Sequence, residues 1–275
     1  MSSKAAVVLA SLAAGAIAVK PIHSHNDYTR DKPLFTALDN GIQSVEADIW
    51  WRDNKLLVSV AFCCAGIDNA DATEVAHTVF DIDSSKTLDS LYIQPILAIV
   101  NGSMESTTPL SKDSPLQLLI DFKTDGDDTY QPLLDALEPL RSGGYLTTFK
   151  DGSLTQGAVT VVGTGNTPLE SVVAAEPRDF FYDANILTLY STKPADGKEW
   201  GPEIAPLASC QWSKVDGDDQ MQELVKGAHD LKIKTRFWDT DSNEETWNKF
   251  WDAGSDWVNA DDLEAISKAW EARNA

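Results

Sequence analysis

Three acidic residues in two separate segments have the spacing expected of a cation site. Glu46 and Asp48 stand two positions apart in the apolar segment Ser44–Trp50, so on a β-strand their side chains point to the same side. Two carboxylates on one face of a buried strand repel each other, and a divalent cation removes that cost. Asp121 ends another apolar run and adds a third carboxylate. We therefore expect Glu46, Asp48 and Asp121 to hold a metal ion.

Basic residues accompany these carboxylates. His23 and His25 stand at the end of the first apolar run, and Lys123 stands two positions after Asp121. The pKa of histidine lies near neutrality, so a histidine can take a proton from an attacking hydroxyl or give one to a leaving alkoxide. Each pattern alone is also common at exposed strand ends. Together they indicate an oxygen-ligand metal site with acid/base histidines beside it.

The elements that must position these residues alternate between strands and helices. Strand-like apolar runs are Lys20–His23, Ser44–Trp50, Leu56–Val60, Leu116–Phe122, Ala158–Gly163, Phe180–Asp183, Ile233–Trp238 and Trp257–Ala260. Helical patterns cover Pro33–Asn40, Tyr130–Arg141, Met221–Leu231 and Leu263–Trp270. About eight strands alternating with helices predict one α/β domain with a TIM-type (β/α)8 barrel, in which catalytic residues sit at the carboxyl ends of the strands. An open doubly wound sheet is the alternative.

Composition argues against several classes of function. The chain has 275 residues, of which 22 are basic and 43 acidic, and its net charge is −21. Such a surface repels nucleic acid and anionic membranes, so we expect no nucleic-acid partner and no stable membrane anchor. An anionic substrate would need a local positive centre such as a bound divalent cation. Cys63, Cys64 and Cys210 have neither a disulfide framework nor metal-ligand spacing.

The first segment of the chain has the composition of an export signal. Lys4 precedes the uncharged run Ala5–Ala18, which ends in the small-residue pattern Ala16-Ile17-Ala18. We expect cleavage before Val19 and secretion of a single-domain monomer formed by residues 19–275. An alanine-rich N-terminal helix is the alternative.

Several segments resemble one known family. His25-Asn26-Asp27-Tyr28, Pro33-Leu34 and Ser44-Val45-Glu46-Ala47-Asp48 are similar to phospholipase-C-like phosphodiesterases of the glycerophosphodiester phosphodiesterase type, and most of all to the proteins called altered inheritance of mitochondria protein 6. Thr87–Ile93 and Leu119–Thr124 support the resemblance, which spans nearly the whole chain after the signal. It implies a TIM-type barrel, one Mg²⁺ or Ca²⁺ ion, two histidines as general acid and base, and hydrolysis of a small phosphodiester, either a glycerophosphodiester or a phospholipid-like substrate.

The chain departs from the family pattern after the third predicted strand. The family carries a histidine there, in a phrase like Leu-Leu-Val-Ala-His, whereas here Leu56-Leu57 leads into Val58-Ser59. Removal of Val58–Glu74 would join Leu57 to Val75-Ala76-His77 and restore the phrase. Val-Ser can be encoded by a splice-donor sequence, so the segment is either a translated intron or a genuine loop insertion. His77 is the candidate second histidine.

The resemblance suggests a role for each candidate residue. A cation on the three carboxylates would neutralise and orient the phosphate, and Lys123 would add a point charge there. His25 and His77 are the expected acid and base, with His23 in reserve for the first-strand role. The attacking group is either water or a hydroxyl of the substrate itself, which would give a cyclic product.

Residues at the ends of later strands are candidates for the substrate pocket. Arg236 and Trp238 end the penultimate predicted strand, and Asn259 and Asp261 end the last. Arg236 could instead pair with an acidic neighbour, and Trp238 could belong to the core. Gly163-Thr164-Gly165-Asn166 could bring backbone amides to a phosphate, although a G-x-G pattern alone is weak evidence.

Two other functions remain open at this point. Nine tryptophans and an export signal suit a barrel glycosidase, but Glu46 and Asp48 on one strand do not flank a scissile bond. A barrel that binds ligand without turning it over becomes the better explanation if Val58–Glu74 is real protein and displaces His77.

Overall fold

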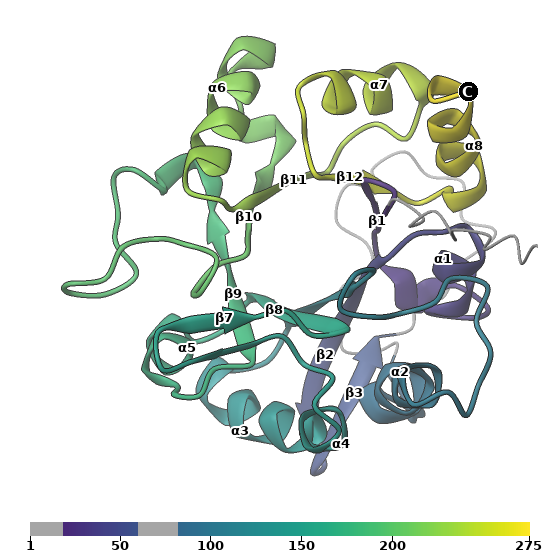
Figure 1. The fold of residues 1–275 in the computed structure, drawn as a ribbon, viewed down its shortest axis with the longest axis vertical. Helices are drawn as coiled ribbons and strands as arrows, with labels where there is room; N and C mark the ends of the chain where they lie inside the picture. The colour runs from purple at the N-terminus through teal and green to yellow at the C-terminus, as the bar shows by residue number, and fades with distance from the viewer. Residues whose placement is uncertain (1–18, 60–81) are drawn as a thin grey trace, which may run out of the picture.

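A closed barrel of parallel strands forms the centre of the computed structural model, which describes residues 19–59 and 82–275 (Figure 1). Eight of the ten strands in its main sheet form the ring, which closes because β1 pairs with both β12 and β2. In chain order the barrel strands are β1 Ile22–Ser24, β2 Ser44–Arg52, β5 Leu116–Phe122, β8 Val159–Gly165, β9 Phe180–Asn185, β10 Leu207–Gln211, β11 Lys234–Trp238 and β12 Trp257–Ala260. The predicted TIM-type barrel is confirmed.

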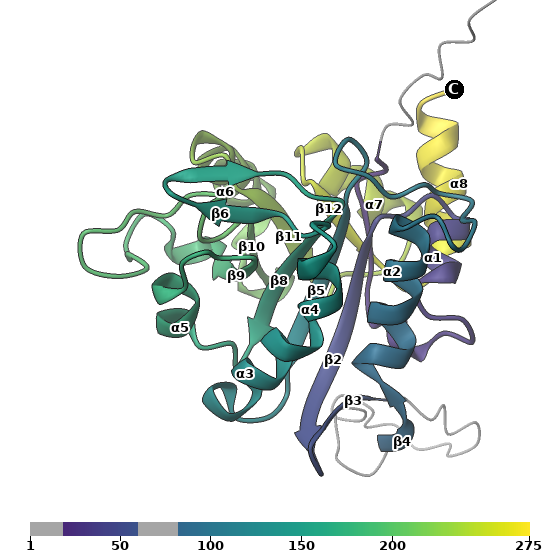
Figure 2. The same cartoon turned by 60° about the horizontal axis from the view of Figure 1, so that its bottom comes forward.

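The strand predicted at Leu56–Val60 lies outside the ring, so its assignment to the barrel is wrong. Asp53 and Asn54 both have positive φ, at 48° and 56°, and form a tight turn that returns the chain along β2. β3 (Lys55–Ser59) therefore pairs antiparallel with β2, and β4 (Ile82–Thr87) pairs antiparallel with β3. Figure 2 shows both strands at the arrowhead end of β2.

β10 takes the place in the ring that the sequence analysis gives to Leu56–Val60. It pairs parallel with β9 on one side and with β11 on the other. Its apolar run ends at Ala208, because Ser209 and Gln211 are polar, so hydrophobicity does not mark it as a strand. Cys210 in this strand is a buried free thiol, whereas Cys63 and Cys64 lie outside the described residues.

Helices surround the barrel and bury the outward faces of its strands (Figures 1 and 2). They are α1 Phe35–Asp39, α2 Gln94–Val100, α3 Gly126–Ala136, α4 Glu138–Ser142, α5 Leu169–Ala174, α6 Gly217–Asp230, α7 Glu244–Asp252 and α8 Leu263–Arg273. The predicted helix Tyr130–Arg141 is divided between α3 and α4, with Pro139 in the first turn of α4. Within the described ranges, no helix has the length and apolarity needed to cross a membrane.

Alternation along the strands separates two environments. Val45, Ala47 and Ile49 of β2 join the main hydrophobic core outside the ring, whereas Glu46 and Asp48 point the other way. A small apolar layer crosses the inside of the ring and consists of Leu119, Val162, Leu207 and Trp257. The inward-facing polar residues are thus held by strands whose other face is fully buried.

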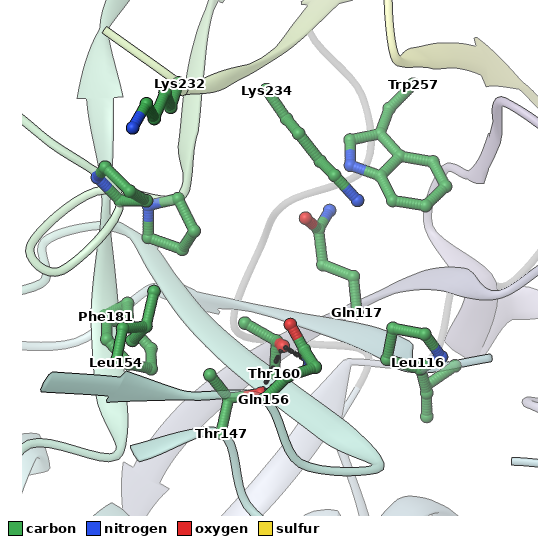
Figure 3. Close-up of a pocket in the computed structure, with 13 residues that line it drawn as sticks. Leu116, Gln117, Thr147, Leu154, Gln156, Thr160, Phe181, Lys232, Lys234 and Trp257 are labelled. Carbon is green, nitrogen blue, oxygen red and sulfur yellow. Dashed lines mark hydrogen bonds between the residues drawn. The ribbon is translucent and has the colours of Figure 1, made fainter. Parts of the chain in front are cut away.

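The amino-terminal mouth of the barrel carries a separate group of side chains (Figure 3). A cavity of about 150 Å³ lies there, lined in part by Gln117, Lys234 and Trp257. The Lys234 ammonium is 4.7 Å from the centroid of the Trp257 ring, a cation–π contact, and burial lowers the pKa of Lys234. The candidate metal ligands lie toward the opposite, carboxyl-terminal mouth.

Asp27 anchors the segment between β1 and α1. Its buried carboxylate accepts hydrogen bonds from the Ser24 hydroxyl at 2.6 Å, the Leu34 amide at 2.6 Å and the Tyr92 hydroxyl at 2.9 Å. Tyr92 belongs to the helix η3 (Asp89–Ile93) that leads into α2. The carboxylate therefore joins the end of β1 to two later elements and fixes the backbone that carries the predicted histidines.

Replacement of Asp27 by alanine should lower the free energy of unfolding by about 3 kcal/mol or more, because three buried donors lose their acceptor. Urea denaturation followed by circular dichroism measures this change. Asp31→Ala is the matched control, since Asp31 is exposed in the same segment, and it should change stability by no more than about 0.5 kcal/mol. Equal unfolding midpoints for the two variants would contradict the anchoring role.

Candidate metal centre and active site

The structure brings the three predicted metal ligands together. Glu46 and Asp48 lie on the inward face of β2, and Asp121 is the register partner of Asp48 on the adjacent strand β5. One carboxylate oxygen from each residue lies within 4.8 Å of the other two. Glu46 and Asp48 are buried and Asp121 is partly buried, so their charges repel each other with little screening by water.

Two basic side chains compensate part of this charge. Lys123 Nζ lies 2.6 Å from Asp121 Oδ2 and 3.1 Å from Asp48 Oδ2, and Arg236 Nη2 donates to Glu46 Oε2 at 2.9 Å. Burial tends to lower the pKa of Lys123, but the carboxylates of Asp48 and Asp121 outweigh it and raise that pKa. Two cations against three carboxylates leave one formal negative charge in the cluster.

Burial and charged partners together set the pKa values of Glu46 and Asp121. Burial raises the pKa of Asp121 to about 6, and the attraction of Lys123 only partly opposes it. Burial acts in the same direction on Glu46, but Arg236 and the hydrogen bond from His23 prevail and hold its pKa well below the usual range. Asp121 therefore binds a proton more readily than Glu46 does.

The segment that follows β1 surrounds this cluster. His23 Nε2 and the amide of Asn26 both lie 3.4 Å from Glu46 Oε2, and the Tyr28 hydroxyl donates to Asp48 Oδ2 at 2.8 Å. Asn26 adopts a left-handed conformation with φ 46°, which turns its amide toward Glu46. Together with Arg236, His23 and Asn26 bring three donors to Oε2 of Glu46, and none of these contacts involves Oε1.

A hydrogen-bonded chain inside the barrel fixes the tautomer of His23. Gln117 Nε2 donates to Ser44 Oγ at 2.9 Å, and Ser44 Oγ lies 2.7 Å from His23 Nδ1. Because the Glu46 carboxylate can only accept, the proton of neutral His23 lies on Nε2, and the Ser44 hydroxyl donates to Nδ1. Burial, followed by the Arg236 charge, lowers the pKa of His23 to about 3. His23 therefore orients Glu46 as a neutral donor.

His25 is more exposed than His23 and pairs with a carboxylate outside the cluster. Its side chain is 27% exposed, and its Nδ1 lies 2.9 Å from Asp261 Oδ1, just beyond β12. This hydrogen bond is the main cause of the lowered pKa of Asp261. Arg30 joins the two segments by donating to the carbonyl oxygens of His25 and Asp261. Arg30 gave no signal in the sequence, because a backbone-binding arginine has no characteristic spacing.

The second predicted histidine, His77, lies outside the described residues. So does the segment Val58–Glu74 apart from its first two residues, which belong to β3. Val58 is fully buried and pairs with Ile49 of β2. Ser59 pairs with Ile82, so β3 and β4 approach each other where the described chain is interrupted.

The structure places Arg236 and Trp238 in different surroundings. Arg236 is buried, where its Nε donates to Asn259 Oδ1 at 3.0 Å and its Nη2 to Glu46, so it pairs with an acidic neighbour. Trp238 is 37% exposed and lines a pocket beside the carboxylate cluster. The same pocket contains Asp183 of β9, which the sequence analysis did not single out because it ends a strand without a neighbouring acidic residue.

Comparisons with known proteins identify the family of this chain. A sequence model described as an AIM6-like phosphodiesterase domain matches residues 12–183. The altered inheritance of mitochondria protein 6 homolog of Arthroderma benhamiae is 31% identical over 89% of this chain and 82% of its own length. Altered inheritance of mitochondria protein 6 of Lachancea thermotolerans is 31% identical, and the alignment covers 90% of this chain and 65% of that protein.

A solved structure shares the fold. The crystal structure of a glycerophosphodiester phosphodiesterase from Parabacteroides distasonis superposes with a TM-score of 0.54 and covers 92% of this chain and 98% of its own. Its sequence identity is 12%, so this likeness concerns the barrel alone.

Gly165 gives the cluster room at the end of β8. Its φ is +64°, and a Cβ atom there would lie 2.0 Å from Asp121 Oδ1 and 2.8 Å from the carbonyl oxygen of Phe122. The glycine therefore permits the observed position of the Asp121 carboxylate, a steric role that the G-x-G pattern at Gly163–Gly165 did not predict.

Gly165→Ala should weaken binding of Mg²⁺ or Ca²⁺ at least tenfold, because the new methyl group displaces the Asp121 carboxylate. Isothermal titration calorimetry measures the affinity. Gly152→Ala is the matched control, since Gly152 also has positive φ, +76°, but a Cβ there meets nothing within 4 Å. Unchanged affinity in Gly165→Ala would remove Asp121 from the ligand set, and an equal loss in both variants would point to backbone strain instead.

Asp183→Asn should stabilise the protein above pH 6. Burial raises the pKa of Asp183 from 3.8 to about 6, so the folded state holds a proton that the unfolded state releases. The stabilisation that this proton gives the folded state is complete below pH 4. It is lost as the pH rises toward 6, which lowers the free energy of unfolding by about 2–3 kcal/mol. Asparagine does not titrate, so its advantage in unfolding free energy should grow between pH 4 and 7.5. Asp113→Asn, at an exposed site, controls for the amide, and a pH-independent Asp183→Asn difference would refute the burial argument.

Proposed function

This chain belongs to the AIM6-like phosphodiesterase family, and we propose on that premise that it is a metal-dependent phosphoric diester hydrolase. The observation that carries the proposal is the convergence of Glu46, Asp48 and Asp121 at the carboxyl-terminal mouth of the barrel, within 4.8 Å of one another. Active sites of TIM barrels occur at this mouth.

The donor set fits a hard divalent cation. Glu46, Asp48 and Asp121 offer only oxygen ligands, which suit Mg²⁺ or Ca²⁺, and Lys123 and Arg236 do not neutralise them fully. Burial is the main cause of the raised pKa of Asp121, and the charges of Asp48 and Glu46 add to it. When bound, the cation would polarise and neutralise a phosphate oxygen.

Residues of the chain supply the remaining chemistry. Lys123, 2.6 Å from Asp121, stands where its ammonium group can also approach a phosphate. His25 donates through Nδ1 to Asp261, which orients the ring and leaves Nε2 for proton exchange with the substrate. We assign the first acid/base role to His25 and keep His77 as the second histidine. Arg236 and His23 hold Glu46 in place and are positioning residues.

Hydrolysis of a chromogenic phosphodiester, with and without a chelator, tests this function. The full chain should be compared with a version that lacks Val58–Glu74. Chelator-sensitive activity confined to the shortened chain would favour both the enzyme and the intron hypothesis, whereas activity in both would make the segment a tolerated loop. Metal binding without turnover in either would support the barrel as a binding protein.

His25→Ala should lower turnover in the active version by about 10²- to 10⁴-fold, because the proton transfer loses its positioned acid or base. His229→Ala is the matched control, since His229 also pairs with a carboxylate, Asp256, at 2.8 Å but lies at the end of α6. The control should retain full activity. Equal turnover of His25→Ala and the unaltered chain would exclude the assigned role.

A further inference from the structure

The cavity at the amino-terminal mouth of the barrel carries positive charge (Figure 3). Leu116, Lys234 and Trp257 line it from the first residues of β5, β11 and β12, and Lys232 adds a second cation. None of the described residues that line the cavity is acidic, although the chain has 43 acidic residues against 22 basic ones. The local charge therefore favours a bound anion.

Lys234 is a cation whose charge the surrounding protein compensates only in part. Burial lowers its pKa, and the charge of Asp256 does not fully oppose this effect. The Asp256 carboxylate is engaged elsewhere, because its Oδ2 accepts from the Thr235 amide at 2.9 Å and lies 2.8 Å from His229 Nε2. An anion beside the Lys234 ammonium would supply the missing negative charge.

Trp257 provides a second group that needs an acceptor. The residue is 3% exposed, and its indole Nε1 is buried with no hydrogen-bond partner in the described parts of the chain. The Lys234 ammonium lies 4.7 Å from the centroid of the same ring, and its flexible stem lets it turn aside and share a ligand with the indole. These two donors match the two oxygens of a carboxylate group.

The walls of the cavity indicate what this carboxylate group is attached to. Leu116, Leu154 and Phe181 contribute apolar side chains. Leu154, on the strand β7 (Ser153–Thr155), is 42% exposed, so an apolar ligand would cover surface that now faces water. The cavity volume of about 150 Å³ is enough for a group the size of a benzene ring. The ligand that fits has an apolar body of about six carbon atoms.

We propose that this cavity binds a small organic carboxylate. Lys234 and the indole N–H of Trp257 hold the carboxylate group, and Leu154 covers the apolar body. The site lies at the opposite mouth from Glu46, Asp48 and Asp121. Its ligand needs no metal ion, so the inference is independent of the proposed function.

Benzoate tests the site, with benzamide as its uncharged analogue and acetate as the analogue without a ring. Isothermal titration calorimetry of the full chain, in the presence of a chelator, should give one-site binding of benzoate with a Kd below about 1 mM. Benzamide and acetate should each bind at least tenfold more weakly. Absence of saturable benzoate binding, or equal affinity for benzamide, would overturn the proposal.

Substitutions locate the bound benzoate. Lys234→Met removes the charge and keeps the length of the side chain, so it should weaken benzoate binding at least tenfold. Trp257→Phe keeps a ring without the N–H group and should also weaken binding. Lys226→Met is the matched control, since Lys226 is exposed on α6, and it should leave the affinity unchanged.

Lys123→Met separates this site from the carboxylate cluster, where a lysine is also present. Full affinity for benzoate in this variant, together with the loss in Lys234→Met, would support the site at the amino-terminal mouth. Loss of binding in Lys123→Met, with full affinity in folded Lys234→Met and Trp257→Phe, would overturn it. Circular dichroism verifies the fold of each variant.

Discussion

Mutual repulsion of three carboxylates at one end of a barrel is the constraint on which the rest of this site depends. Glu46, Asp48 and Asp121 stay together because the register of β2 and β5 is fixed by apolar residues on the opposite face of each strand. Lys123 and Arg236 lower the electrostatic cost without removing it. Apolar packing outside the ring thus stabilises the fold and offsets the electrostatic cost of the carboxylates inside it.

Two histidines that stand two positions apart in the sequence have opposite environments. His23 lies inside the ring, where Glu46 and Ser44 fix its tautomer and burial prevents it from becoming charged at neutral pH. His25 lies at the rim, with Asp261 as its partner and part of its ring in solvent. Sequence reasoning could name both residues but could not assign their different roles, because these depend on burial and on a partner just beyond β12.

Much of the site follows from local pattern, since the strand period of two places Glu46 and Asp48 on one face and Asp121 ends a clearly apolar run. The ring was predictable for the same reason, but the identity of all eight strands that form it was not. Apolar periodicity reports burial and not chain direction, so the reversal at Asp53-Asn54 was hidden. β10 was missed because its inward residues serve a polar pocket. The hydrogen-bond partners of Asp183 and Asp261 come from segments that are distant in the sequence, so the sequence alone does not reveal them.

The antiparallel arm formed by β3 and β4 is a place where the length of the chain can vary without a change in the barrel. Its strands lie outside the ring, and Ser59 and Ile82 are paired, so the intervening chain begins and ends at neighbouring points. Residues can be gained or lost between these points without altering the shear or closure of the eight-stranded ring. Because the arm extends from the end of β2, its length can change beside the carboxyl-terminal mouth while the eight-stranded ring stays the same.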